Sequence, residues 1–249
     1  MELFKTKLDI GITGRAKVTQ VPQDFKKDLD PANLDLEDGE AVSSWQGAEQ
    51  LDSQYQPTYQ VGSDGLPYVL FDGSSWMFGP EEFIPSSMSQ DHTIYAIMER
   101  IGTGSAVCLG WNDTSEGGSF QNGWSILHIS ARRFAVRWGG DGGTGNRDQW
   151  RPGERFCFAN RVRANWWQDV QFKGTSQAGH VARTGVPPDE EDVPFILGSV
   201  SSKADDPPVG SLAQFRLYRL IMYERLIDPV EHQAIQELLN NKYNTDDMG

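Results

Sequence analysis

Arginine and tryptophan side chains concentrate between residues 132 and 167, and they are the side chains of this sequence best suited to hold a ligand. The segment contains eight arginines and three carboxylates, a net charge of +5 in a chain whose formal net charge is −13. Tryptophan faces stack on sugar rings or on guanidinium groups, and arginine pairs with carboxylates of acidic glycans or of a neighbouring protein. The candidate binding residues are Arg137, Trp138, Trp150, Arg151, Trp166 and Trp167.

Three interpretations of this segment remain open on the sequence alone. The tryptophans and arginines fit a platform for glycans, and they also fit an interface with partner proteins, because Trp and Arg are preferred interface anchors. In the third interpretation the tryptophans fill a sandwich core and the arginines lie on its rim. Exposure of Trp150 and Arg151 in an open groove would favour the glycan, and coverage by another chain would favour the interface.

No catalytic motif stands out, so we predict a protein that is not an enzyme and that has no cofactor or metal site. Retaining glycosidases hold two carboxylates about 5 Å apart, and a Glu-x-Asp-x-x-Glu strand that would do so is absent. Residues 189–192 are four adjacent acidic residues after two prolines, which favours a solvated loop. The four histidines lack metal-ligand spacing, no Gly-x-Ser-x-Gly elbow occurs, and the glycine-rich stretch 139–145 leads into neither a helix nor a lysine.

Charge and composition narrow the class of protein further. The excess of 35 Asp and Glu over 22 Lys and Arg argues against nucleic-acid binding, which needs a concentrated basic surface. No apolar run approaches the roughly 20 residues that span a bilayer, and residues 1–5 do not look like a secretion signal. Cys108 and Cys157 lie in apolar, strand-like segments, which predicts buried free thiols rather than a disulfide.

Short strands joined by turns must position these residues. The 26 glycines, the 13 prolines and many period-two segments predict an all-β, antiparallel two-sheet β-sandwich. Strands are expected at 68–72, 76–78, 92–101, 106–111, 124–129, 133–138, 155–162, 169–173 and 195–198. The pair Asp72-Gly73 favours a tight turn, so strands 68–72 and 76–78 are predicted to form a hairpin. Asp72 is then expected to bind backbone amides rather than calcium.

Residues 211–243 are the unit around which the rest of the chain is organised. Strict alternation places Phe215, Leu217, Ile221 and Tyr223 on one face of a strand and Tyr218, Leu220 and Met222 on the other. Both faces are apolar, which predicts a central strand. Asp228, Pro229 and Glu231 provide an N-cap, a first-turn proline and a capping box. The helix is expected to pack through the side that carries Val230, Ala234, Ile235, Leu238 and Leu239.

Two stretches resemble the concanavalin A-like jelly rolls, particularly the laminin-G and pentraxin-like modules of phage and bacterial surface proteins. One is the motif Tyr223-Glu224-Arg225-Leu226-Ile227-Asp228, at the end of the last strand and the start of the C-terminal helix. The other is a series of short motifs in the same order as in the family: Leu29-Asp30-Pro31, Asp38-Gly39, Trp45, Pro57-Thr58-Tyr59 and Phe71-Asp72-Gly73. The chain departs from the family at Gln46-Gly47-Ala48, where the family commonly has Asp-x-Ser-Gly, so an ion site that depends on that aspartate is in doubt.

The resemblance implies a jelly-roll domain over residues 29–249, with a short C-terminal helix at 228–241, and an N-terminal extended arm over residues 1–28. The arm is either a segment that adds to a neighbouring subunit's sheet or an edge strand of the same sandwich. The family implies a non-enzymatic structural or adhesion protein of a phage virion, located on the capsid surface, neck or tail. Such a protein would be present in several copies, contact other virion proteins through residues 1–28, and bind host polysaccharide. A free carbohydrate-binding lectin and a glycoside hydrolase with an unfamiliar site are the alternatives.

Overall fold

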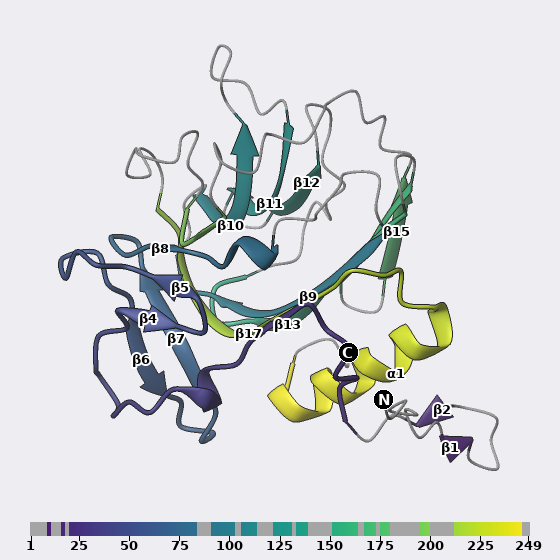
Figure 1. Cartoon of the computed structure of the whole chain (residues 1–249), viewed down its shortest axis with the longest axis horizontal. Helices are drawn as coiled ribbons and strands as arrows, with labels where there is room; N and C mark the ends of the chain where they lie inside the picture. Colours follow the sequence, from purple (N-terminus) through teal and green to yellow (C-terminus); the bar gives the residue numbers. More distant parts are fainter. Residues whose placement is uncertain are drawn as a thin grey trace, which may run out of the picture.

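The computed structural model describes residues 9–10, 16–17, 20–83, 91–102, 106–113, 122–130, 133–138, 151–163, 167–172, 175–179, 195–199 and 212–245. Within these residues strands predominate, and one α-helix lies near the C-terminus (Figure 1). The prediction of an all-β sandwich with a short C-terminal helix is therefore confirmed.

Two antiparallel sheets form the sandwich. The larger sheet has the order β15-β14-β13-β9-β17-β7-β6, with β3 paired to β17. Its strands are β3 (Lys27–Leu29), β6 (Thr58–Val61), β7 (Pro67–Asp72), β9 (His92–Arg100), β13 (Arg155–Arg163), β14 (Trp167–Phe172), β15 (Thr175–Gly179) and β17 (Gln214–Tyr223). The smaller sheet has the order β12-β11-β10-β16-β8-β5-β4. Its strands are β4 (Ser44–Trp45), β5 (Ala48–Glu49), β8 (Met77–Phe78), β10 (Ala106–Asp113), β11 (Asn122–Ser130), β12 (Arg133–Trp138) and β16 (Ile196–Leu197).

The core between the sheets is apolar and rich in aromatic rings. Phe71 and Phe215 of the larger sheet stack with their ring centroids 4.8 Å apart, and they belong to the same buried cluster as Trp45 and Met77 of the smaller sheet. Cys108 lies in this cluster, whereas Cys157 belongs to a second cluster. Both cysteines are free and buried, as predicted.

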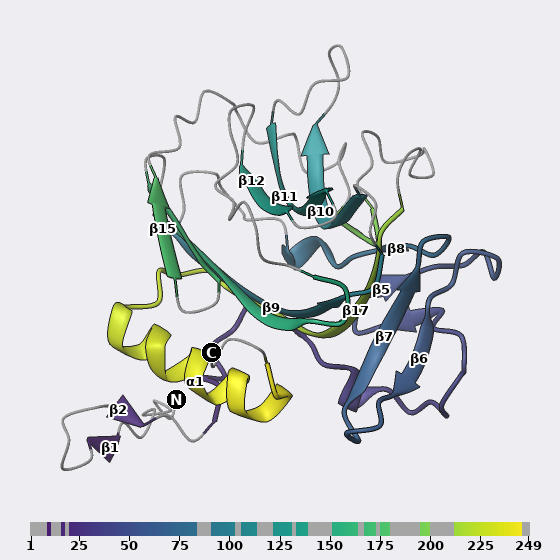
Figure 2. The same cartoon turned by 180° about the vertical axis from the view of Figure 1, so that it is seen from behind.

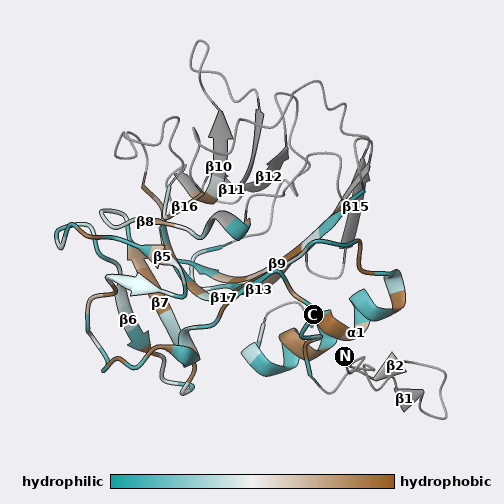
Figure 3. Ribbon diagram, viewed as in Figure 1, coloured by the Kyte–Doolittle hydropathy of each residue, from teal (hydrophilic) through white to brown (hydrophobic). Residues whose placement is uncertain are grey.

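The second cluster covers the other face of the larger sheet. Helix α1 (Pro229–Tyr243) packs there, on the convex side of the curved sheet in both views of the ribbon (Figures 1 and 2). Ile235 and Leu239 of the helix join Tyr95 and Ile97 of β9 in this cluster. Figure 3 shows hydrophobic and hydrophilic stretches on α1, as expected for a helix that buries one side.

Strand β17 is central, as the sequence predicts, but its two faces are not those given by strict alternation. It pairs with β9, β7 and β3. The register against β9 shifts between Leu217 and Arg219, which leaves Tyr218 as an extra residue. Such a bulge reverses the order of faces beyond it. As a result Leu220 rather than Ile221 shares the inner core with Leu217, so the predicted face assignment holds for Tyr218 but is wrong for residues 220–223.

The predicted hairpin between residues 68–72 and 76–78 is also wrong. Strand β7 belongs to the larger sheet and β8 to the smaller sheet, so the chain crosses from one layer to the other at this turn. The prediction that Asp72 binds backbone amides is confirmed. Its Oδ1 accepts hydrogen bonds from the backbone amides of Ser74 and Ser75, at 2.8 and 3.0 Å.

The N-terminus of α1 is capped by Asp228, whose Oδ1 accepts bonds from the amides of Val230 and Glu231 at 2.9 and 3.1 Å. The sequence predicts that Glu231 closes a capping box. Its carboxylate is bound by Arg225, with N···O distances of 2.7 and 2.8 Å. Val230 is 57% exposed, contrary to its predicted place on the packed side, while His232 is buried. The Tyr95 hydroxyl lies 2.7 Å from His232 Nδ1, which explains why a polar residue occupies that side.

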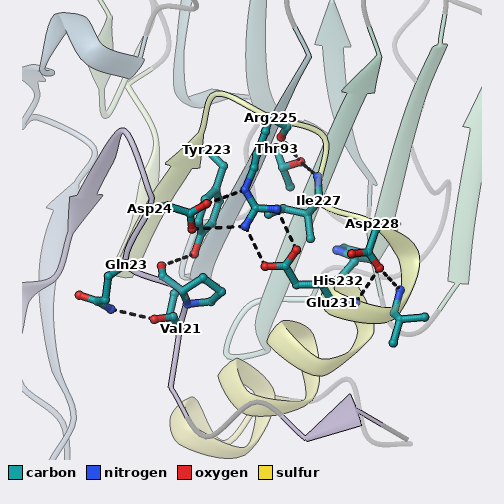
Figure 4. A network of polar contacts seen from close by, with 12 residues as sticks. Val21, Gln23, Asp24, Thr93, Tyr223, Arg225, Ile227, Asp228, Glu231 and His232 are labelled. Atoms are coloured by element: carbon teal, nitrogen blue, oxygen red, sulfur yellow. Dashed lines mark hydrogen bonds and ion pairs between the residues drawn. The ribbon is translucent and has the colours of Figure 1, made fainter. Parts of the chain in front are cut away.

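Residues 20–28 are fixed to their own sandwich by a polar network (Figure 4). Arg225 binds Asp24, with Nε···Oδ2 at 2.7 Å, as well as the helix residue Glu231. The Tyr223 hydroxyl donates to the carbonyl of Pro22 at 2.9 Å, and Arg219 pairs with both oxygens of Asp28. Strand β3 therefore crosses the predicted domain boundary at residue 28. The separate sheet of β1 (Asp9–Ile10) and β2 (Ala16–Lys17) contacts α1 through β2.

An Asp228→Ala variant is expected to lose about 1 kcal/mol of unfolding free energy, because two amides of the first helical turn lose their acceptor. Urea unfolding monitored by circular dichroism measures this loss. Asp228→Asn keeps an acceptor and should stay close to the parent protein. Equal losses in both variants would contradict a capping role for Asp228.

Candidate functional site

An open groove lies at the end of the smaller sheet formed by β4, β5 and β8. Its volume is about 860 Å³, and two segments of the chain contribute its walls. The groove, which we call the Tyr55 groove, is lined by Gly47, Glu49, Gln50, Leu51, Asp52, Gln54, Tyr55, Trp76, Phe78, Gly79, Pro80 and Glu82. Figure 1 shows β5 and β8 side by side, and the backbone pairing of Glu49 with Phe78 joins the two walls.

Three aromatic side chains supply the apolar part of the lining. The Trp76 ring is almost fully buried and lies 6.1 Å from Tyr55 and 4.9 Å from Phe78, measured between ring centroids. Phe78 meets Trp76 edge-on, and Tyr55 is tilted against it. Tyr55 and Phe78 are only half-buried, so their rings keep accessible surface. A buried indole thus supports two accessible rings at this site.

Hydrogen bonds fix the polar part of the lining. Gln50 is buried, and its Nε2 donates to the carbonyl of Trp76 at 3.0 Å, which ties the segment after β5 to the segment before β8. The amide of Trp76 in turn donates to the carbonyl of Tyr55 at 3.0 Å. Gln54 donates to both carboxylate oxygens of Asp52, through its backbone amide at 3.1 Å and its side chain at 2.8 Å. These bonds orient the Asp52 carboxylate before any ligand arrives.

The charged residues of the lining are all acidic: Glu49, Asp52 and Glu82. Lys27 lies beside the groove, with its Nζ 3.1 Å from Glu82 Oε1. A hydrogen bond from its own backbone amide lowers the pKa of Glu82; burial opposes this, and the bond from Lys27 lowers it further. Glu82 is therefore a carboxylate at neutral pH.

This lining can hold a neutral or weakly polar molecule that offers both apolar faces and hydrogen-bond donors. Aromatic rings bind apolar faces, and the fixed carbonyl and carboxylate oxygens accept hydrogen bonds from donors at the edges of the ligand. The exposed Leu51, with 86% of its surface accessible, extends the apolar rim. A few polar groups of fixed orientation beside apolar surface are typical of ligand sites.

None of the residues predicted from the sequence is among the described lining residues of this site. Arg137 and Trp138 are the last residues of β12 in the smaller sheet, whereas Trp167 is the first residue of β14 in the larger sheet. Arg151 is exposed, and its backbone amide donates to Glu154 Oε2 at 2.8 Å. Trp150 and Trp166 lie outside the described residues, as do the side chains of Arg137, Trp138 and Trp167. A common binding surface for these six residues stays a prediction.

The sequence does not reveal the Tyr55 groove, because its local patterns indicate other roles for the lining residues. They predict a hairpin for Trp76 and Phe78, and the polar run from Glu49 to Gln54 has no motif. The available signal was the dense mixture of Gln, Asp and Tyr in residues 49–55, followed by an aromatic pair two strands later. Polar and aromatic side chains mixed in this way are typical of a ligand surface rather than of a core.

In the part of the chain that the structure describes, no three His, Cys, Asp or Glu side chains come together in a way that could hold a metal ion. Among the same residues, no helix has the length and apolar character required to cross a membrane.

The fold is shared with known carbohydrate-active proteins. No protein-family model matches the sequence, and no curated protein sequence is significantly similar to it. The chain is similar in structure to Trypanosoma rangeli sialidase in complex with 2,3-difluorosialic acid, with a TM-score of 0.55 and 13% identity over 97% of this chain and 37% of the sialidase. It is also similar to domain 4 of AbnA, a GH43 extracellular arabinanase from Geobacillus stearothermophilus in complex with arabinotriose. There the TM-score is 0.53 and the identity 15%, over 81% of this chain and 85% of that domain.

These likenesses show the fold alone: a β-sandwich, consistent with a concanavalin A-like jelly roll. The chain spans about a third of the length of the sialidase and most of the arabinanase domain.

Proposed function

We propose that this chain is a carbohydrate-binding protein that holds a glycan in the Tyr55 groove. The observation that carries the proposal is the pairing of accessible aromatic rings with fixed oxygen acceptors in one open groove. Sugar rings present apolar C–H faces and a perimeter of hydroxyl donors, so the two kinds of lining match the two kinds of ligand surface. The shared fold supports this choice, because the arabinanase domain of the same architecture was solved with arabinotriose.

Replacing Tyr55 by alanine is expected to weaken glycan binding about tenfold or more, since truncation of a central aromatic anchor costs about 2 kcal/mol in many interfaces. Isothermal titration against a panel of oligosaccharides, arabinotriose among them, measures the change. Tyr55→Phe keeps the ring and should retain most of the affinity. Phe25→Ala removes a half-buried aromatic ring from the other side of the larger sheet and serves as the matched control. Equal affinities for Tyr55→Ala and Phe25→Ala would contradict a role for the groove.

We also propose that the protein has no catalytic activity. The support for this proposal is the sequence, in which the carboxylate spacing of a sandwich glycanase is absent. A reducing-sugar assay on a panel of polysaccharides tests this part, and the expected result is no turnover above buffer. Turnover that is abolished by replacing a single carboxylate would overturn it.

We also propose that the protein is a structural or adhesion component of a phage virion, present in several copies. The ordered sequence phrases from Leu29 to Tyr243 support this location. Contacts with other virion proteins would come from residues 1–19, because residues 20–28 are bound to their own sandwich. Mass spectrometry of purified phage particles should detect the full chain, and a chain lacking residues 1–19 should fold but fail to enter them. Particles without the protein would contradict this location.

A further inference from the structure

The charge of the Tyr55 groove restricts which glycans it can accept. Its charged lining residues, Glu49, Asp52 and Glu82, are exposed acids, and the groove has no Lys, Arg or His among its described lining residues. The neighbouring cation Lys27 is already paired with Glu82, and four-fifths of its side chain is covered. An anionic ligand would therefore meet these carboxylates beside a cation that Glu82 already neutralises.

Asp52 places one of these negative charges close to Tyr55 along the chain, so the repulsion of an anionic ligand acts at a particular point of the groove. Gln54 donates to both oxygens of Asp52, and these two bonds favour one orientation of the exposed carboxylate. The backbone amide of Tyr55 donates to the main-chain carbonyl of Asp52 at 3.0 Å, which closes a turn between these two lining residues. A sugar that stacks on Tyr55 would place its hydroxyl edge near this carboxylate. Hydroxyl groups gain a charge-assisted hydrogen bond there, whereas a carboxylate substituent would be repelled.

The remainder of the chain strengthens the same preference. The formal net charge of −13 gives the molecule a negative field that lowers the local concentration of anions and slows their approach. Specificity of this kind arises from a repulsive element directed against the wrong ligand as well as from contacts to the right one.

We infer that the Tyr55 groove selects uncharged glycans, such as neutral pentose or hexose oligosaccharides, and excludes glycans that carry sialic or uronic acids. This inference rests on the proposed function and adds the chemical class of the ligand. It separates the chain from the sialidase with which it shares its fold, because that protein was solved with sialic acid derivatives.

A matched pair of ligands tests the inference: lactose and its sialylated form, or a neutral polysaccharide and a form of it with uronic acid substituents. The neutral member should bind at least about tenfold more tightly at low salt, and added salt should narrow the difference because it screens the carboxylates. The double variant Asp52→Asn, Glu82→Gln keeps the shapes of both side chains and should lose most of the discrimination. Glu40→Gln, an exposed acid outside the groove, is the control and should leave it unchanged.

The outcomes separate this inference from the proposed function. Equal binding of both ligands, reduced by Tyr55→Ala, overturns the selectivity and leaves a glycan site in the groove. Loss of discrimination in the double variant, with neutral binding retained, supports the selectivity. If no member of the panel binds in a manner that depends on Tyr55, the proposed function is wrong and the selectivity is wrong with it.

Discussion

Replacing Gly198 by alanine is expected to lower the free energy of unfolding by about 2 to 5 kcal/mol. Gly198 follows β16 with φ +93°, a left-handed conformation that costs an alanine about 1–2 kcal/mol. A Cβ atom at this position would lie 2.7 Å from the carbonyl oxygen of Ser75 and 2.8 Å from Cδ1 of Phe71. Overpacking of a core adds about 1–3 kcal/mol. Chemical denaturation with urea measures the total.

The conformation and the close packing of Gly198 can be separated by a second glycine. Gly39 has the same φ of +93°, and an added Cβ there would meet nothing within 4 Å. Gly39→Ala should therefore show the conformational cost alone. The Cβ at residue 198 would also approach Cα of Trp76 at 3.1 Å, so Gly198→Ala should weaken glycan binding in the Tyr55 groove, whereas Gly39→Ala should not. Equal destabilisation of the two variants would contradict the packing argument.

Local patterns were sufficient to predict the strands of six or more residues, the helix and its cap. The apolar run of β17 and the Asp228-Pro229 start of α1 contain their own structural signals, and both were found within a few residues of their predicted places. The faces of β17 could not be predicted, because one extra residue at Tyr218 depends on pairing with β9 from far away in the chain. Alternation alone cannot reveal such a bulge.

The candidate site could not be predicted for a related reason. Asp72-Gly73 has the composition of a hairpin turn, yet the strands on either side belong to different sheets. That crossing brings Trp76 and Phe78 beside the 49–55 segment and so creates the groove. Sheet order is set by tertiary packing rather than by local composition, so a site built between separate segments is visible only in the structure.

Glu99 is the centre of a partly buried charge cluster at the end of β9. Its Oε1 is bound by Arg216, and its Oε2 accepts a bond from the Tyr218 hydroxyl at 2.8 Å and lies 3.5 Å from Arg155 Nη2. Burial raises the pKa of Tyr218 above its ordinary value, and the hydrogen bond to Glu99 raises it further, so the phenol remains a donor at neutral pH. Arg155 also bonds Asp64 and the carbonyl of Tyr243, which links this cluster to the end of α1.

Replacing Glu99 by alanine is therefore expected to lower the free energy of unfolding by about 3 kcal/mol, since it removes the carboxylate that Arg216, Arg155 and the Tyr218 hydroxyl share in a partly buried place. This loss of unfolding free energy is at the low end of the usual range for a buried ion pair, because the Arg216 side chain keeps 35% of its surface exposed. Glu237→Ala, an exposed acid of α1 bonded to Gln233, is the matched control and should change stability by no more than about 0.5 kcal/mol. Arg216→Met should cost less than Glu99→Ala, because Glu99 retains Tyr218 and Arg155. If thermal and urea unfolding give Glu99→Ala the same stability as Glu237→Ala, the cluster does not stabilise the larger sheet. The contacts of Arg155 with Asp64 and Tyr243 would then hold α1 without Glu99.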